Sequence, residues 1–140
     1  MNSHPHHFPP RQTLLLILVP LLATFAGQRL FLHSVGVHHV YPGGYLVHHL
    51  FFGALLLIPA AFTLALGPRS WLTAAFSRIA LGSGTAMILD EIVYLVATEA
   101  SDADYISPLS LNGAIVFVAL GVLLLWVLYK LQPAEHRRLH

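Results

Sequence analysis

The chain has 140 residues, of which 56% are hydrophobic and only 9% are charged. A soluble domain usually carries about a quarter charged residues, so this composition excludes a water-soluble surface and indicates an integral membrane protein. A net charge of +1 gives no basic field for nucleic acid, and the absence of cysteine excludes disulfides and thiolate metal sites.

The chain begins with a polar segment, residues 1–12, in which histidines alternate with prolines and which we expect to be disordered. The first apolar run, residues 13–32, is long enough for one helical crossing of a bilayer. Pro20 lies inside this run, where a membrane helix tolerates proline because neighbouring helices satisfy the freed backbone groups. A turn signal at Pro42-Gly43-Gly44 precedes a second crossing, which we predict over residues 45–66.

A third crossing is predicted over residues 75–97, after a break in the apolar pattern. Small residues recur in it at helical spacing and predict the close approach of another helix. They are Gly82, Gly84 and Ala86. An acidic loop over residues 99–108 leads to a fourth crossing at residues 109–131, and residues 132–140 form a polar, basic tail.

Six of the seven basic residues fall on one side of this arrangement, namely Arg11, Arg69, Arg78, Lys130, Arg137 and Arg138. The seventh, Arg29, lies near the far end of the first crossing. The loops on the other side contain no lysine or arginine. By the positive-inside rule, both termini are therefore cytoplasmic. We predict an all-α, multi-pass protein of the inner membrane, a four-helix bundle with no separate soluble domain.

Two predicted crossings contain ionisable residues within apolar runs. His48 and His49 lie in the second crossing, and Asp90 and Glu91 lie in the third. An ionisable group inside a membrane is costly and needs a partner, which makes it a candidate functional residue. Both pairs lie near the outer end and come within reach if the two helices pack together. Adjacent helical positions point about 100° apart, so we expect only one member of each pair to face a given neighbour.

A cluster of imidazoles and carboxylates allows three interpretations. The first is a divalent metal, namely zinc, iron, manganese or copper, bound by these four residues. The second is haem b, held axially by His33 and by His48 or His49. The third is a structural network of hydrogen bonds and ion pairs that includes Arg29. The residues expected to surround or complete a metal site are Arg29, His33, His38, His39, Tyr94 and Asp104.

Three motifs follow one another over residues 45–110. They are Val47-His-His-Leu-Phe-Phe-Gly53, Gly82-Ser-Gly-Thr-Ala-Met-Ile-Leu-Asp90-Glu91 and Asp104-Tyr105-Ile-Ser107. In this order they resemble a group of small, uncharacterised prokaryotic integral membrane proteins. The resemblance implies a shared site on the second and third crossings and implies no reaction. The chain has Leu46 where that group often has a further histidine, which argues against a motif of three histidines.

We therefore expect an integral membrane protein whose outward half carries a His/carboxylate site that binds a divalent transition metal. One alternative is a non-catalytic subunit of a larger membrane complex, in which the polar cluster is a structural network. Another is a small proton-coupled exporter that uses Asp90 or Glu91, and a chain of four spans would need to form a homo-oligomer to build a pathway. The expected partners are the lipid bilayer and such membrane subunits, and the sequence leaves open whether the protein is an enzyme.

Overall fold

The computed structural model describes residues 8–36, 43, 47–67 and 70–132, which form helices and no β-sheet. The helices are α1 (Pro10–Val35), α2 (His49–Leu66), α3 (Trp71–Ala97), α4 (Asp102–Tyr105) and α5 (Pro108–Leu131). All except the short α4 are long and apolar enough to cross a membrane. This result confirms the predicted all-helical chain with four helices of membrane-spanning character.

The predicted boundaries hold to within a few residues, with α2 as the clearest difference. Helix α1 begins at Pro10 rather than at residue 13, and α3 begins at Trp71 rather than at residue 75. Helix α2 begins at His49 rather than at residue 45, and Val47 and His48 precede it in non-helical conformation. The predicted tails fall mainly at residues 1–7 and 133–140, which lie outside the described part of the chain.

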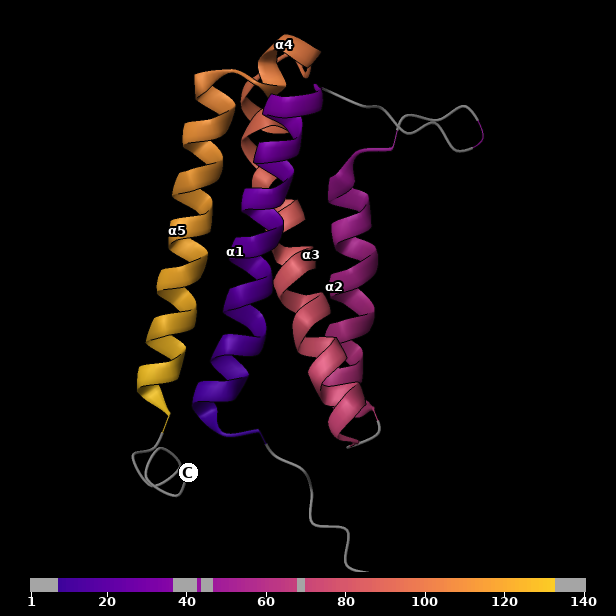
Figure 1. Ribbon diagram of the computed structural model, residues 1–140, viewed down its shortest axis with the longest axis vertical. Helices are drawn as coiled ribbons and strands as arrows, with labels where there is room; N and C mark the ends of the chain where they lie inside the picture. The colour runs from indigo at the N-terminus through magenta and orange to yellow at the C-terminus, as the bar shows by residue number, and fades with distance from the viewer. Residues whose placement is uncertain (1–7, 37–42, 44–46, 68–69, 133–140) are drawn as a thin grey trace, which may run out of the picture.

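Helix α3 is the central element of the bundle. Helices α1, α2 and α5 each pack against it, and α1 also contacts α5 (Figure 1). The short α4 lies at one end of the bundle, between the end of α3 and the start of α5. The first residues of α1 and the last residues of α5 lie together at the opposite end (Figure 1).

Local side-chain bonds fix where three of the helices begin. The hydroxyl of Ser70 accepts a hydrogen bond from the backbone N–H of Thr73 at the start of α3. Ser101 and Asp104 form a reciprocal capping box at the start of α4, and Ser107 caps α5. Each cap satisfies a backbone N–H that has no partner within its own helix, so the serines set these boundaries.

Glycines allow α3 to approach both neighbouring helices closely. A Cβ atom at Gly84 would lie 2.5 Å from the carbonyl oxygen of Gly53 in α2, and one at Gly82 would collide with the carbonyl oxygen of Ile17 in α1. Ala86 is fully buried and packs with Leu21 of α1 and with α5. The predicted small-residue contact is thus confirmed, and it serves two helices rather than one.

Replacing Gly82 or Gly84 by Leu should lower the thermal stability of the detergent-solubilised protein. We expect a loss of about 1–3 kcal/mol or more, because the added atoms meet backbone that cannot move aside. Gly27→Ala is the matched control, since a Cβ there would have no atom within 4 Å. That control should be neutral or slightly stabilising, because alanine favours the helix over glycine. Equal melting temperatures for Gly84→Leu and Gly27→Ala would contradict this packing.

Candidate functional site: a buried ion-pair cluster

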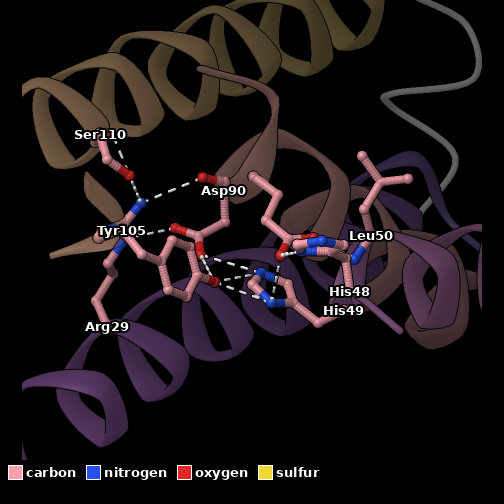
Figure 2. Close-up of polar contacts among 8 residues, drawn as sticks. Arg29, His48, His49, Leu50, Asp90, Tyr105 and Ser110 are labelled. Carbon is pink, nitrogen blue, oxygen red and sulfur yellow. Dashed lines mark hydrogen bonds and ion pairs between the residues drawn. The ribbon is translucent and has the colours of Figure 1, made fainter. Parts of the chain in front are cut away.

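Ionisable and polar side chains from all five helices meet at the end of the bundle that carries α4 (Figure 2). They are Arg29 of α1, His48 and His49 at the start of α2, Asp90 and Glu91 of α3, Tyr105 of α4 and Ser110 of α5. Asp90 and Glu91 are only 0% and 2% exposed, and Arg29 is 6% exposed. Charges buried this deeply persist only when they are paired and hydrogen-bonded.

The ion pair between Arg29 and Asp90 lies at the centre of the cluster. The Arg29 Nε donates to Asp90 Oδ1 at 2.5 Å. The two terminal nitrogens of the guanidinium donate to the backbone carbonyls of Tyr105 and Asp90, both at 3.2 Å, and to Ser110 Oγ at 3.2 Å. One side chain of α1 is therefore bonded to α3, α4 and α5 at the same time.

Glu91 explains why α2 begins where it does. Its Oε2 accepts the backbone N–H of Leu50 at 2.6 Å. His48, the residue before the helix, is extended and makes no capping bond with its own side chain. The first N–H groups of a helix lack intrahelical partners, and a negative charge at that end is favourable. A carboxylate of α3 thus caps α2 from outside, which sequence patterns within α2 cannot reveal.

Both histidines reach Glu91. The Oε1 atom of Glu91 lies 3.1 Å from His48 Nδ1 and 3.3 Å from His49 Nδ1. The expectation that only one histidine could face a given neighbour is therefore wrong, because His48 precedes the helix and is free of the helical 100° rotation. The carboxylates do separate as expected, since Asp90 pairs with α1 and Glu91 contacts α2.

His49 and Tyr105 connect the two carboxylates. The His49 Nε2 lies 3.2 Å from Asp90 Oδ2, so that this one ring has a carboxylate oxygen beside each nitrogen. The Tyr105 hydroxyl donates to Asp90 Oδ2 at 3.2 Å and lies 2.8 Å from His49 Nε2. Figure 2 shows these side chains pointing toward one another from three helices.

Tyr105 and Ser110 are members of the cluster that sequence reasoning missed. Asp104 was the expected participant from this segment, but its carboxylate instead bonds the hydroxyl of Ser101 at 2.7 Å and caps α4. The signal was present in the sequence, because Ser101-Asp-Ala-Asp104 fits a capping pattern that would begin a short helix. That helix is what presents the next residue, Tyr105, to the carboxylates.

Tyr94 supports the cluster through packing rather than through a hydrogen bond to it. Its hydroxyl donates to the Ala100 carbonyl at 2.6 Å, while its ring lies 4.6 Å from the Tyr105 ring, centroid to centroid. His33 is exposed near the end of α1 and makes no bond to the cluster within the part of the chain described. His38 and His39 lie outside the described residues.

Hydrogen bonds already satisfy the carboxylate oxygens of the cluster. Those of Asp90 accept from Arg29 and Tyr105, and Glu91 Oε2 accepts from Leu50. Within the described ranges, no group of three or more His, Asp or Glu residues has the arrangement of a metal site. The chemistry available is that of a charged hydrogen-bond network made of one guanidinium, two carboxylates and two imidazoles.

No protein-family model matches the chain, and searches of curated proteins and of solved structures find no similar protein. The motif resemblance to small prokaryotic membrane proteins therefore stays a prediction. The site rests on its geometry alone.

Replacing Arg29 by Met should lower stability by about 3–5 kcal/mol, because Asp90 would remain buried without a counter-charge. Arg29→Lys should restore only part of this loss, since an ammonium group cannot reproduce the forked contacts to Tyr105 and Ser110. Arg11→Met, on the exposed first turn of the same helix, is the control and should change little. Thermal unfolding in detergent measures all three. An Arg29→Met protein as stable as the control would refute the central role of the ion pair.

Proposed function

We propose that this is a multi-pass inner-membrane protein whose buried cluster binds one cation from the outward side, and that this cation is a proton. Chains of Asp, Glu and His inside membrane proteins are typical of proton relays. The proposed role is therefore that of a proton-coupled membrane protein, in which proton binding at the cluster accompanies transport or gating.

The orientation rests on the distribution of charge. Among the described residues, Arg11, Arg78 and Lys130 lie toward the end of the bundle where α1 begins and α5 ends. Glu99, Asp102 and Asp104 lie at the end that carries α4 and the cluster. Cytoplasmic segments of membrane proteins are enriched in lysine and arginine, which supports an outward position for the cluster.

The formal charges of the cluster indicate that it lacks one positive charge. With both histidines neutral, the single guanidinium of Arg29 leaves one negative charge on the two carboxylates. The N-terminus of α2 at Glu91 contributes only about half a positive charge. One added proton completes the balance, whereas a divalent metal would exceed it.

The geometry around His49 is the observation that carries the proposal. A neutral imidazole has one N–H, whereas an imidazolium donates from both nitrogens. His49 has Asp90 Oδ2 at 3.2 Å from one ring nitrogen and Glu91 Oε1 at 3.3 Å from the other. The contact to Asp90 is a hydrogen bond, the contact to Glu91 is an ion-pair distance, and the Tyr105 hydroxyl lies 2.9 Å from Nδ1. A carboxylate close to each ring nitrogen favours the positive charge of the protonated form. The side chains of His48 and His49 are 20% and 22% exposed, so a proton has access to them from outside.

A divalent transition metal is the second candidate, favoured by a different observation. Glu91 Oε1 lies 3.1 Å and 3.3 Å from the Nδ1 atoms of His48 and His49, and two imidazoles with a carboxylate are ligands that zinc accepts. These side chains would have to move to surround a metal, because among the described residues no three such groups are arranged for one. The Leu50 N–H would then orient the carboxylate by bonding its other oxygen. No observation favours haem, since His33 is exposed and has no bond to the cluster among the described residues.

Cysteine labelling tests the orientation. A cysteine at Asp102 should react with a membrane-impermeant maleimide added to intact cells, because its loop faces outward. A cysteine at Ser70, at the opposite end of α3, should react only after permeabilisation. The native chain contains no cysteine, so the background is low. The reverse pattern would place the cluster on the cytoplasmic side.

Nitrogen-15 NMR of histidine-labelled protein tests whether the bound cation is a proton. At neutral pH, wild type should show an imidazolium signal that His49→Ala removes. Glu91→Gln should also remove it, because the cluster then balances its charge without an added proton. Glu99→Gln, an exposed carboxylate outside the cluster, is the control and should retain the signal.

Elemental analysis of the same preparations separates the two candidates. One metal ion per chain in wild type and none in the His48→Ala/His49→Ala variant would favour the metal over the proton. A preparation with neither bound metal nor imidazolium would leave the cluster as a structural network, as expected of a subunit of a larger complex.

A further inference from the structure

Phe8, Trp71 and Arg78 form an aromatic–arginine group at the end of the bundle where α1 and α3 begin, opposite the ion-pair cluster (Figure 1). Trp71 and Arg78 lie seven residues apart on α3 and so share one face of that helix. The ring of Phe8, just before α1, contacts both, with its centroid 5.0 Å from Arg78 Cζ and 6.0 Å from the centroid of the Trp71 ring. The guanidinium is therefore held between the start of α1 and the first turns of α3.

The guanidinium of Arg78 points back toward the start of α3. Its Nη1 donates to the carbonyl oxygen of Ala74, one turn earlier, at 2.8 Å. Arg78 lies about 10 Å along a helix that is long and apolar enough to cross a membrane. A long basic side chain at such a position extends toward the membrane surface. The charged end of Arg78 therefore reaches the depth of the lipid headgroups.

Arg78 has no carboxylate partner among the described residues, since none of their ion pairs includes it. The described acidic residues all lie in the other half of the bundle, namely Asp90, Glu91, Glu99, Asp102 and Asp104. Glu135, the sixth acidic residue of the sequence, lies outside the described residues. A guanidinium stays protonated and carries five N–H donors, and a charge at the edge of a membrane needs a counter-charge. An anion from outside the protein would supply one.

The surroundings of Arg78 restrict the chemistry of such an anion. Trp71 is 54% exposed at the start of a membrane-spanning helix, a position typical of tryptophan at the level of the headgroups. Exposed Arg11 and Lys130 add positive charge to the same end of the bundle. A zwitterionic headgroup brings an ammonium group with its phosphate, and no carboxylate of the described residues lies here to pair with that group. Charge complementarity therefore favours a phospholipid with a net negative charge.

We propose that Arg78 binds the phosphate of an anionic phospholipid at this end of the bundle. The guanidinium N–H groups that Ala74 leaves unused donate to the phosphate oxygens, a pairing that arginine commonly makes. Phe8 covers the guanidinium, and Trp71 borders the headgroup from the same face of α3. The site lies at the opposite end from the ion-pair cluster, so it goes beyond the proposed cation binding and does not depend on which cation the cluster binds.

The two tryptophans of the chain make lipid binding at this site measurable. In a Trp126→Phe protein, Trp71 is the only tryptophan, and brominated lipids beside it quench its fluorescence. The full chain would be placed in bilayers that mix phosphatidylglycerol with phosphatidylcholine, with one or the other lipid brominated. Phosphatidylglycerol should bind beside Trp71 about fivefold more tightly, which corresponds to about 1 kcal/mol for one basic residue at an anionic headgroup. Equal binding of the two lipids would overturn the proposal, and this comparison needs no change at Arg78.

Two variants that each remove one positive charge assign the preference to Arg78. Arg78→Gln should abolish the preference reported by Trp71, whereas Lys130→Gln, at an exposed position at the same end of the bundle, should retain it. Equal losses in the two variants would indicate a general effect of surface charge and would overturn the site. Inorganic phosphate, compared with chloride at equal ionic strength, should leave the preference unchanged. Loss of the preference in phosphate would refute the lipid in favour of a soluble anion.

Discussion

The buried pair of Arg29 and Asp90 is the interaction on which the upper half of the bundle depends. Both charges are almost entirely buried, and the loss of either would leave the other uncompensated in an apolar environment. The guanidinium also bonds the backbone carbonyl of Tyr105 and the hydroxyl of Ser110, so α4 and α5 are held by the same side chain. Lipid exerts no hydrophobic force between helices, so such polar contacts and close glycine packing determine which helices meet.

Glu91 links the ionisable groups of the cluster to the start of helix α2. The same carboxylate caps α2 at Leu50 and contacts both histidines, so a change in its charge would affect the start of α2 as well as the imidazoles. In the proposed function, this coupling gives proton binding a mechanical consequence.

The sequence alone predicted the number of membrane-spanning helices and four members of the buried cluster. Apolar length is a local property of some 20 consecutive residues, so the spans can be found without a structure. The cost of ionisable groups in lipid likewise marked His48, His49, Asp90 and Glu91 as mutual partners, and the structure does bring them together. The small residues Gly82 and Gly84 similarly predicted close helix contacts, because their spacing on one helix is fixed.

Only the tertiary structure decided how that cluster is completed. Arg29 was an expected partner of the carboxylates, but which carboxylate it pairs with was open: it meets Asp90 across 61 residues of chain. Ser110, which was not expected, lies 81 residues from Arg29, so no local pattern relates them. Helix α2 begins at His49 because Glu91 of α3 caps it. Since His48 then lies outside the helix, its ring can reach Glu91. These features arise from contacts between helices, which a single sequence specifies but does not display.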